Sequence, residues 1–188
     1  KKNMYGISDR NVLKNFSEHF CRIVEKYCKY IIVSGYVAIA SGRSRATEDI
    51  DMIIERIPKE KFIDLHKDLT IEGFICIQDD DPEELFNYLK ENTSIRYDRK
   101  EMALPNLELK FAKDFLDEYQ IKTRIKLPLT GLDIWFSSIE MNIAFKEEYL
   151  KSEKDLEDAR HLRKVYKDQI NEESIHHIKG LIQKWRLH

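Results

Sequence analysis

Residues 31–54, IIVSGYVAIASGRSRATEDIDMII, decide how the chain is interpreted. The apolar residues 30–33 predict a strand, Ser34 and Gly35 interrupt it, and residues 36–40 predict a short helix that ends near Gly42. A polar loop then leads into a second predicted strand at 50–54. Backbone amides at the start of a helix are unpaired and carry partial positive charge, so this turn suits a bound phosphate.

Two acidic residues stand at the start of the second predicted strand. Asp49 and Asp51 are two residues apart, so in a strand both carboxylates project from one face, while Ile50 and Met52 face the other way. Neighbouring carboxylates repel each other and attract a hard divalent cation, and oxygen ligands of this kind suit Mg²⁺, or Mn²⁺ in its place. Metal ions held there could activate an attacking oxygen and stabilise a pyrophosphate leaving group.

Outside this stretch, the sequence predicts strands mixed with helices and then helices alone. Ser8 is expected to cap a first helix, Pro58 to begin a second and Asp81 to cap a third. Further strands are expected at 74–77, 95–97 and 107–112, with a hairpin joining 123–127 to 132–136. Helices are expected at 138–150 and 153–168, and a last amphipathic helix places Ile175 and Trp185 on one side. This order predicts an α+β fold, with a small mixed β-sheet flanked by helices over residues 1–136 and a C-terminal helical subdomain over 137–188.

Composition excludes several classes of protein. A chain of 188 residues with 42% hydrophobic residues can bury a sizeable core, and its apolar runs fall short of the roughly 18 to 20 residues of a membrane span. We therefore expect a soluble protein with no membrane partner. Lys and Arg (32) nearly balance Asp and Glu (34), so any contact with nucleic acid must be local. The three cysteines lack CxxC spacing and the start of the sequence carries no secretory segment, which favours a cytoplasmic location.

The strand, small-residue turn, short helix and D-x-D strand together resemble the signature of the nucleotidyltransferase fold of the polymerase β superfamily. The variant is most similar to prokaryotic nucleotidyltransferases of the AbiEii toxin type, which carry a Gly-Arg-x-Arg-x-Thr-like loop before D-x-D. Here that loop begins at Gly42. Glu140 with Lys146 six residues on, and KDLED at 154–158, are similar to further motifs of these proteins. One departure is the pair Ser34-Gly35, where the family has Gly-Gly or Gly-Ser.

The resemblance implies roles for individual residues. Asp49 and Asp51 would be catalytic and would bind metal, together with a third carboxylate from a neighbouring strand that acts as general base. Glu108 is our choice for this acid, because it lies on the polar side of an apolar strand, and Asp98 and Asp133 are the alternatives. The residues expected to contact the nucleotide are Ser34, Gly35, Arg43, Arg45, Thr47 and Lys146.

These features predict a Mg²⁺-dependent, ATP- or other NTP-using nucleotidyltransferase that moves a nucleoside monophosphate to a hydroxyl and releases pyrophosphate. The acceptor could be RNA, a protein or a small molecule. A tRNA-directed enzyme would need a local basic surface, for which the sequence offers Lys164, Lys167, Lys179, Lys184 and Arg186. The alternative is a non-catalytic nucleotide- or partner-binding module of a toxin–antitoxin or defence system, which the departure at Ser34 and the choice among third acids motivate.

Overall fold

The computed structural model describes the backbone of residues 3–43, 49–102 and 104–187, and their side chains from residue 11 onwards. Its helices are α1 (Asn3–Val24), α2 (Gly35–Ala40), α3 (Lys59–Ile71), α4 (Pro82–Lys90), α5 (Phe115–Lys122), α6 (Ile139–Phe145), α7 (Glu153–Val165) and α8 (Glu172–Arg186). A π-helical turn, η1 (Lys146–Leu150), follows α6 directly. None of the described helices is long and apolar enough to cross a membrane.

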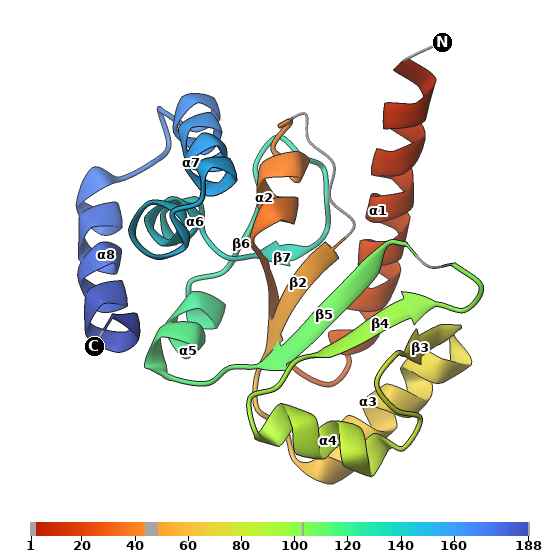
Figure 1. The fold of residues 1–188 in the computed structure, drawn as a ribbon. Coiled ribbons are helices and arrows are strands. Elements are labelled where there is room, and N and C mark those ends of the chain that lie inside the picture. Colours follow the sequence, from red (N-terminus) through yellow and green to blue (C-terminus); the bar gives the residue numbers. More distant parts are fainter. Residues whose placement is uncertain (1–2, 44–48, 103, 188) are drawn as a thin grey trace.

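The described strands form one mixed sheet at the centre of the molecule (Figure 1). They are β1 (Tyr30–Val33), β2 (Asp49–Ile54), β3 (Phe74–Cys76), β4 (Ile95–Arg99), β5 (Asn106–Phe111), β6 (Ile125–Lys126) and β7 (Trp135–Phe136). Their order across the sheet is β3-β4-β5-β2-β1-β7-β6, and the pairs β2–β5 and β1–β7 are parallel while the others are antiparallel. Strands β2 and β5, distant in sequence, are therefore direct neighbours.

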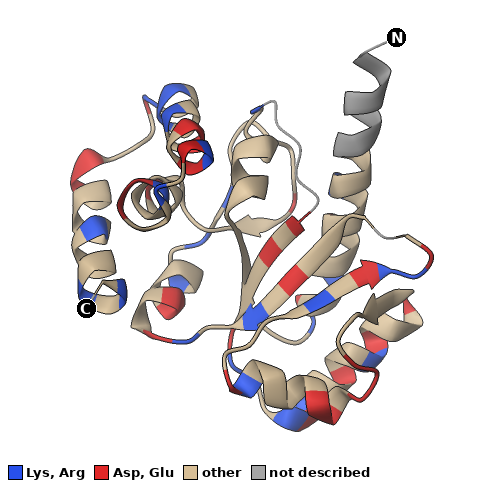
Figure 2. Cartoon of the chain, viewed as in Figure 1, with Lys and Arg blue, Asp and Glu red and all other residues tan. Residues whose placement is uncertain are grey.

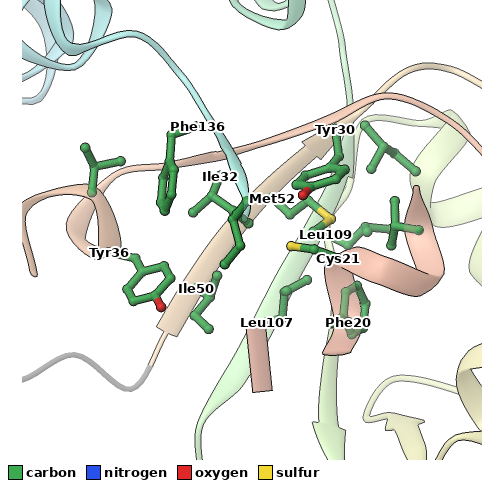
Figure 3. Packing of buried hydrophobic residues seen from close by; sticks show 14 of the residues in the cluster. Phe20, Cys21, Tyr30, Ile32, Tyr36, Ile50, Met52, Leu107, Leu109 and Phe136 are labelled. Carbon is green, nitrogen blue, oxygen red and sulfur yellow. The ribbon is translucent and has the colours of Figure 1, made fainter. Parts of the chain in front are cut away.

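Apolar and polar residues alternate along β2 and β5, so the two faces of the sheet differ in character. Ile50, Met52, Leu107 and Leu109 are fully buried, and Figure 3 shows them packed with Phe20 of α1. Phe20 also packs against an aromatic ring of β4, with ring centroids 5.4 Å apart. Burying each such aliphatic side chain contributes roughly 1.5–3 kcal/mol, so this face anchors the sheet. The intervening residues of β2 and β5 face the other side.

The second face is covered only in part. Ile31, Ile53, Ala112 and Ile121 form a small separate cluster where α5 packs on β1 and β2. Beyond α5, the consecutive elements α6, η1 and α7 pack together, and α8 packs on α5 and α6 (Figure 1). The polar residues of β2 and β5 therefore face the space between the sheet and these helices.

The α+β prediction with a mixed sheet is confirmed, and several boundaries differ from expectation. The first helix does not begin after Ser8 but already at Asn3, because the apolar stripe marks only the part of α1 that packs on the sheet. In Figure 1 its first turns project beyond the core. The helix expected at 138–150 is α6 followed by the π-helical turn. Trp185 is 40% exposed, so the amphipathic pattern of α8 overstated its burial.

Candidate functional site

Pairing between β2 and β5 brings two carboxylates side by side. Asp51 is the register partner of Glu108, and Asp49 is the partner of Asn106. Partners on adjacent strands project from the same face, so Asp49, Asp51 and Glu108 all lie on the incompletely covered side of the sheet. Figure 2 shows acidic positions on β2 and β5 next to one another in the middle of the sheet.

The environment of Asp51 disfavours its charged form. The pKa of this carboxyl is raised from 3.8 to about 6, chiefly by burial, then by the neighbouring charge of Glu108 and to a smaller extent by that of Asp49. The ammonium group of Lys110 and a hydrogen bond from the Ser34 hydroxyl lower the pKa and oppose these effects in part. A carboxylate perturbed by both burial and like charge in a cavity is typical of a functional site.

Glu108 is contacted by two residues at the start of the neighbouring strand β4, Ser94 just before it and Arg96 within it. The Ser94 hydroxyl donates to Glu108 Oε1 at 2.5 Å, and Arg96 Nη2 lies 4.0 Å from Glu108 Oε2. Of the alternatives for the third acid, Asp98 lies on β4 opposite Asn106, one row further along the sheet. Asp133 has a side chain 93% exposed and an ion pair with Lys126 at 2.7 Å. The structure thus brings Glu108, rather than either alternative, next to Asp51.

A cavity of about 290 Å³ opens over these carboxylates. Its floor is the sheet and its walls come from α5, α6, η1 and α8. The π-helical turn contributes Lys146, Tyr149 and Leu150, and turns of this kind are frequent at functional sites. The lining includes Ser34, Asp51, Glu108, Lys110, Lys113, Asp117, Gln120, Ser137, Asn142, Phe145, Lys146, Tyr149 and Arg186.

The donor set at this cavity fits a magnesium ion that binds together with a nucleotide. In the described part of the chain, no three His, Cys, Asp or Glu side chains lie close enough together to hold a metal on their own. In nucleotide sites, however, Mg²⁺ takes one or two carboxylates and completes its shell with waters and substrate phosphates. Asp51 and Glu108 would suffice as protein ligands, and a cation there would offset the burial and the charge of Glu108 that raise the pKa of Asp51.

Ser34 has a backbone conformation that favours glycine. Its φ of 69° and ψ of −141° lie outside the regions that residues with a side chain ordinarily adopt. The Ser34 hydroxyl makes no capping bond to α2; Ser34 lines the cavity beside Asp51, where its hydroxyl lowers the pKa of that carboxyl slightly. Gly35 is buried as the first residue of α2. Serine at position 34, where the resembled family has glycine, therefore adopts a strained backbone conformation next to the Asp51 carboxylate.

We expect Ser34→Gly to stabilise the protein and Ser34→Ala to destabilise it. Glycine removes a backbone cost of order 1–3 kcal/mol but also loses the favourable interaction of the hydroxyl with Asp51, which leaves a net gain of about 1 kcal/mol. Alanine loses the same interaction and keeps the strain. Thermal unfolding should give a Tm about 2–4 °C above wild type for the glycine variant and below wild type for the alanine variant. Equal Tm values for the two variants would contradict this account.

The other residues predicted to contact the nucleotide or the metal do not all lie at the cavity. Arg43 Nε lies 2.6 Å from Asp158 Oδ1 and Arg43 Nη2 lies 2.6 Å from Glu157 Oε2, so this side chain joins the end of α2 to α7. Lys146 is buried at the cavity wall, with its Nζ 3.6 Å from Asp158 Oδ2. Arg45 and Thr47 lie outside the described residues. Asp49 is exposed at the start of β2.

Sequence reasoning missed a hydrogen-bond network on the cavity wall. Arg186 Nη2 donates to Asp117 Oδ1 at 2.9 Å, Gln120 Nε2 donates to the same oxygen at 3.3 Å, and the Ser137 hydroxyl donates to Gln120 Oε1 at 3.1 Å. These residues come from α8, from α5 and from the segment between β7 and α6, and no spacing in the sequence predicts that α8 would reach α5. Arg186 is only 7% exposed and Lys179 is paired with Glu147, so neither adds a free cation to the basic surface considered above.

The sequence matches no protein-family model and no curated protein. Among solved structures, an antigenic nucleotidyltransferase-like protein from Paracoccidioides brasiliensis aligns over 90% of this chain and 86% of its own, with a TM-score of 0.53 and 18% identity. The antibiotic-resistance factor ANT(2'')-Ia aligns over 88% of this chain and 89% of its own, with a TM-score of 0.51 and 14% identity. The chain therefore has a nucleotidyltransferase-like fold.

Proposed function

We propose that this protein is a divalent-metal-dependent nucleotidyltransferase, related in type to the AbiEii group, that transfers a nucleoside monophosphate from an NTP to a hydroxyl group. The observation that carries the proposal is the pairing of Asp51 with Glu108 on adjacent parallel strands beneath a cavity. The raised pKa of Asp51 supports it, because a carboxylate that is buried and lies beside the like charge of Glu108 is one that a bound cation would stabilise. The fold seen in both structural neighbours supports the same class of reaction.

The reaction we propose is a single in-line displacement. The acceptor oxygen forms a bond to the α-phosphorus, the bond from that phosphorus to the bridging oxygen breaks, and pyrophosphate leaves with the electron pair. The Glu108 carboxylate accepts the proton of the acceptor hydroxyl and passes it to solvent. Asp51 and Glu108, with Asp49 beside them, would hold Mg²⁺ or Mn²⁺, which when bound neutralises phosphate charge and favours departure of pyrophosphate.

Residues around the carboxylates have supporting parts in this proposal. Ser34 would orient Asp51 through its hydroxyl, and Lys110 offers positive charge next to the reacting phosphates. The aromatic side chains Phe145 and Tyr149 offer apolar surface for the base or sugar at the opposite wall. A six-residue helix has a small dipole, so α2 would add little to phosphate binding beyond its first amides.

The decisive experiment is a transfer assay with each radiolabelled NTP, Mg²⁺ and cell extract, in which the labelled macromolecule or small molecule is isolated. We expect wild type to label an acceptor and to release pyrophosphate only when Mg²⁺ or Mn²⁺ is present. Asp51→Asn should reduce labelling by at least about 10³-fold, because it removes a metal ligand from the reacting centre. Asp133→Asn, which changes an exposed acid that does not line the cavity, is the matched control and should retain full activity.

A second candidate is a non-catalytic nucleotide- or partner-binding module, for example half of a toxin–antitoxin or defence pair. The observation that favours it is that the described carboxylates do not by themselves form a three-ligand metal cluster. Calorimetry separates the two candidates. A catalyst should bind NTP only together with Mg²⁺ and lose that binding in Asp51→Asn, whereas a module would bind its ligand equally well in EDTA and in the variant.

A further inference from the structure

A second cavity lies on the far side of α5 from the first. It has a volume of about 410 Å³ and is lined by Lys29, Glu55, Arg56, Glu118, Lys122 and Arg124, with Ala112 and Ile121 at its base. Four cations and two carboxylates therefore face one space, in a chain whose net charge is −2. A local excess of positive charge of this kind attracts anions.

The two arginines of this cavity are held in place by neutral groups. Arg56 Nη1 donates to the backbone oxygen of Ala112 at 3.1 Å and Nη2 donates to that of Lys90 at 2.9 Å, while the guanidinium lies 5.3 Å from the ring centroid of Phe111. Arg124 Nη1 donates to the backbone oxygen of Tyr30 at 3.1 Å. Its guanidinium lies 4.3 Å from the ring centroid of Trp135. Both groups are oriented without losing their charge.

Three other arginines in the described chain are held differently. Arg43, Arg163 and Arg186 each bind carboxylates directly, which neutralises them. Neither Arg56 nor Arg124 forms an ion pair with a described carboxylate, and the same holds for the ammonium groups of Lys29 and Lys122. An arginine that is bound by carbonyl oxygens and an aromatic ring forms no ion pair within the fold. Its positive charge is therefore available to bind an anion.

The linings of the two cavities come closest in sequence at the end of β5 and in the segment that follows it. Lys110 and Lys113 line the first cavity, while Ala112, between them in sequence, lines the second. Figure 2 shows basic positions at the end of β5 and in the segment that leads to α5. Neither Lys110 nor Lys113 has an ion pair with an acid of the described chain. Cations therefore extend from the proposed reacting centre, past the start of α5, into the second cavity.

We propose that this second cavity is a phosphate-binding subsite for the acceptor, and that the acceptor is a single strand of RNA whose terminal hydroxyl reaches Glu108. This inference rests on the proposed function. A strand carries evenly spaced phosphates, which match cations distributed along a path, whereas a small acceptor in the first cavity would leave Arg56 and Arg124 without a ligand. Positive charge along this path disfavours polycationic acceptors.

The test measures binding of a fluorescent single-stranded oligoribonucleotide of about 12 nucleotides as a function of salt. Removing two phosphate contacts should lower the slope of log K against log salt by about 1.4 and weaken binding on the order of 10-fold or more at low salt. We expect this for Arg56→Gln/Arg124→Gln. The same is expected for Lys29→Gln/Lys122→Gln, which changes exposed side chains and keeps the proposal testable if the arginine variant fails to fold.

The matched control is Lys14→Gln/Lys59→Gln, which removes two exposed charges from α1 and α3 and should leave the slope unchanged. An equal effect of the control, or no effect of either test pair, would overturn the subsite. The subsite would also be overturned if the protein bound vesicles of anionic lipid more tightly than RNA. Failure of the proposed function is separate, because it would appear as metal-independent NTP binding that Asp51→Asn leaves intact, whatever the RNA result.

Discussion

Asp51→Asn should make the metal-free protein more stable while it removes nucleotidyl transfer. The pKa of Asp51 is raised from 3.8 to about 6, first by burial and then by the charge of Glu108, so the folded state disfavours the ionised carboxyl. A carboxyl with a raised folded-state pKa causes no penalty below its ordinary pKa and a full penalty above the folded value. We expect the asparagine variant to gain ~1–2 kcal/mol above pH 6, less than the full shift implies because the cavity admits solvent.

Urea unfolding in EDTA at a series of pH values checks this expectation. The stability difference between Asp51→Asn and wild type should be near zero below about pH 4, grow between pH 4 and 6, and stay constant above that. Asp133→Asn should show no such rise, because its carboxylate is paired with Lys126 and its pKa is lowered. A difference that is flat across the whole range would mean that Asp51 is not strained by its surroundings.

When both Mg²⁺ and NTP are present, wild type should become more stable than Asp51→Asn. A cation that binds the folded protein stabilises it in proportion to the logarithm of ligand concentration over Kd, and only wild type offers the complete ligand set. Binding of the cation would then explain why the protein has an acid at position 51 that destabilises its metal-free form. This is the pattern expected where a site trades stability for activity.

Much of the candidate site could be predicted from the sequence because it is local. The spacing of Asp49 and Asp51 on one strand, and the alternation that places Glu108 on a polar face, follow from the period of two in β-structure. The turn at Ser34 was recognised as well. The spacing of residues in the sequence does not determine the register between strands. The pairing of β2 with β5 places Glu108, rather than Asp98 or Asp133, beside Asp51.

The remainder depends on contacts between residues far apart in the chain. The sequence predicts a contact of Arg43 with the nucleotide, but it does not indicate that Glu157 and Asp158 of α7 lie within hydrogen-bond distance of Arg43. The second basic cavity joins the start of β1, the end of β2 and the end of α5, and nothing in the local sequence distinguishes Arg56 or Arg124 from a solvated cation. Tertiary packing alone makes these charges converge.

The second large effect is expected at Asp158, which has no solvent exposure and lies between Arg43 and Lys146. Its carboxylate is 3.6 Å from the Nζ of Lys146, a side chain that is itself only 1% exposed. Removing one partner of a buried ion pair typically costs about 3–5 kcal/mol, because the other charge stays buried without its compensation. Asp158→Asn should therefore lower Tm by roughly 10 °C or more. Glu157→Gln, one residue away on α7 and bonded to the same Arg43, should change Tm little because that side chain is 44% exposed.

The double variant Lys146→Met/Asp158→Asn tells a buried-charge effect from a packing effect. If the loss in Asp158→Asn comes from leaving the Lys146 charge buried, an apolar side chain of similar length at 146 should recover at least half of it, since replacing both partners of a buried pair is often nearly neutral. If the loss comes from packing around α7, the second change should add to the first. Thermal unfolding of the four proteins in the cycle gives the answer directly. NTP binding by the double variant, measured with Mg²⁺, then tests whether the Lys146 charge serves the nucleotide or only the fold, because a structural lysine would leave Kd unchanged once stability is restored.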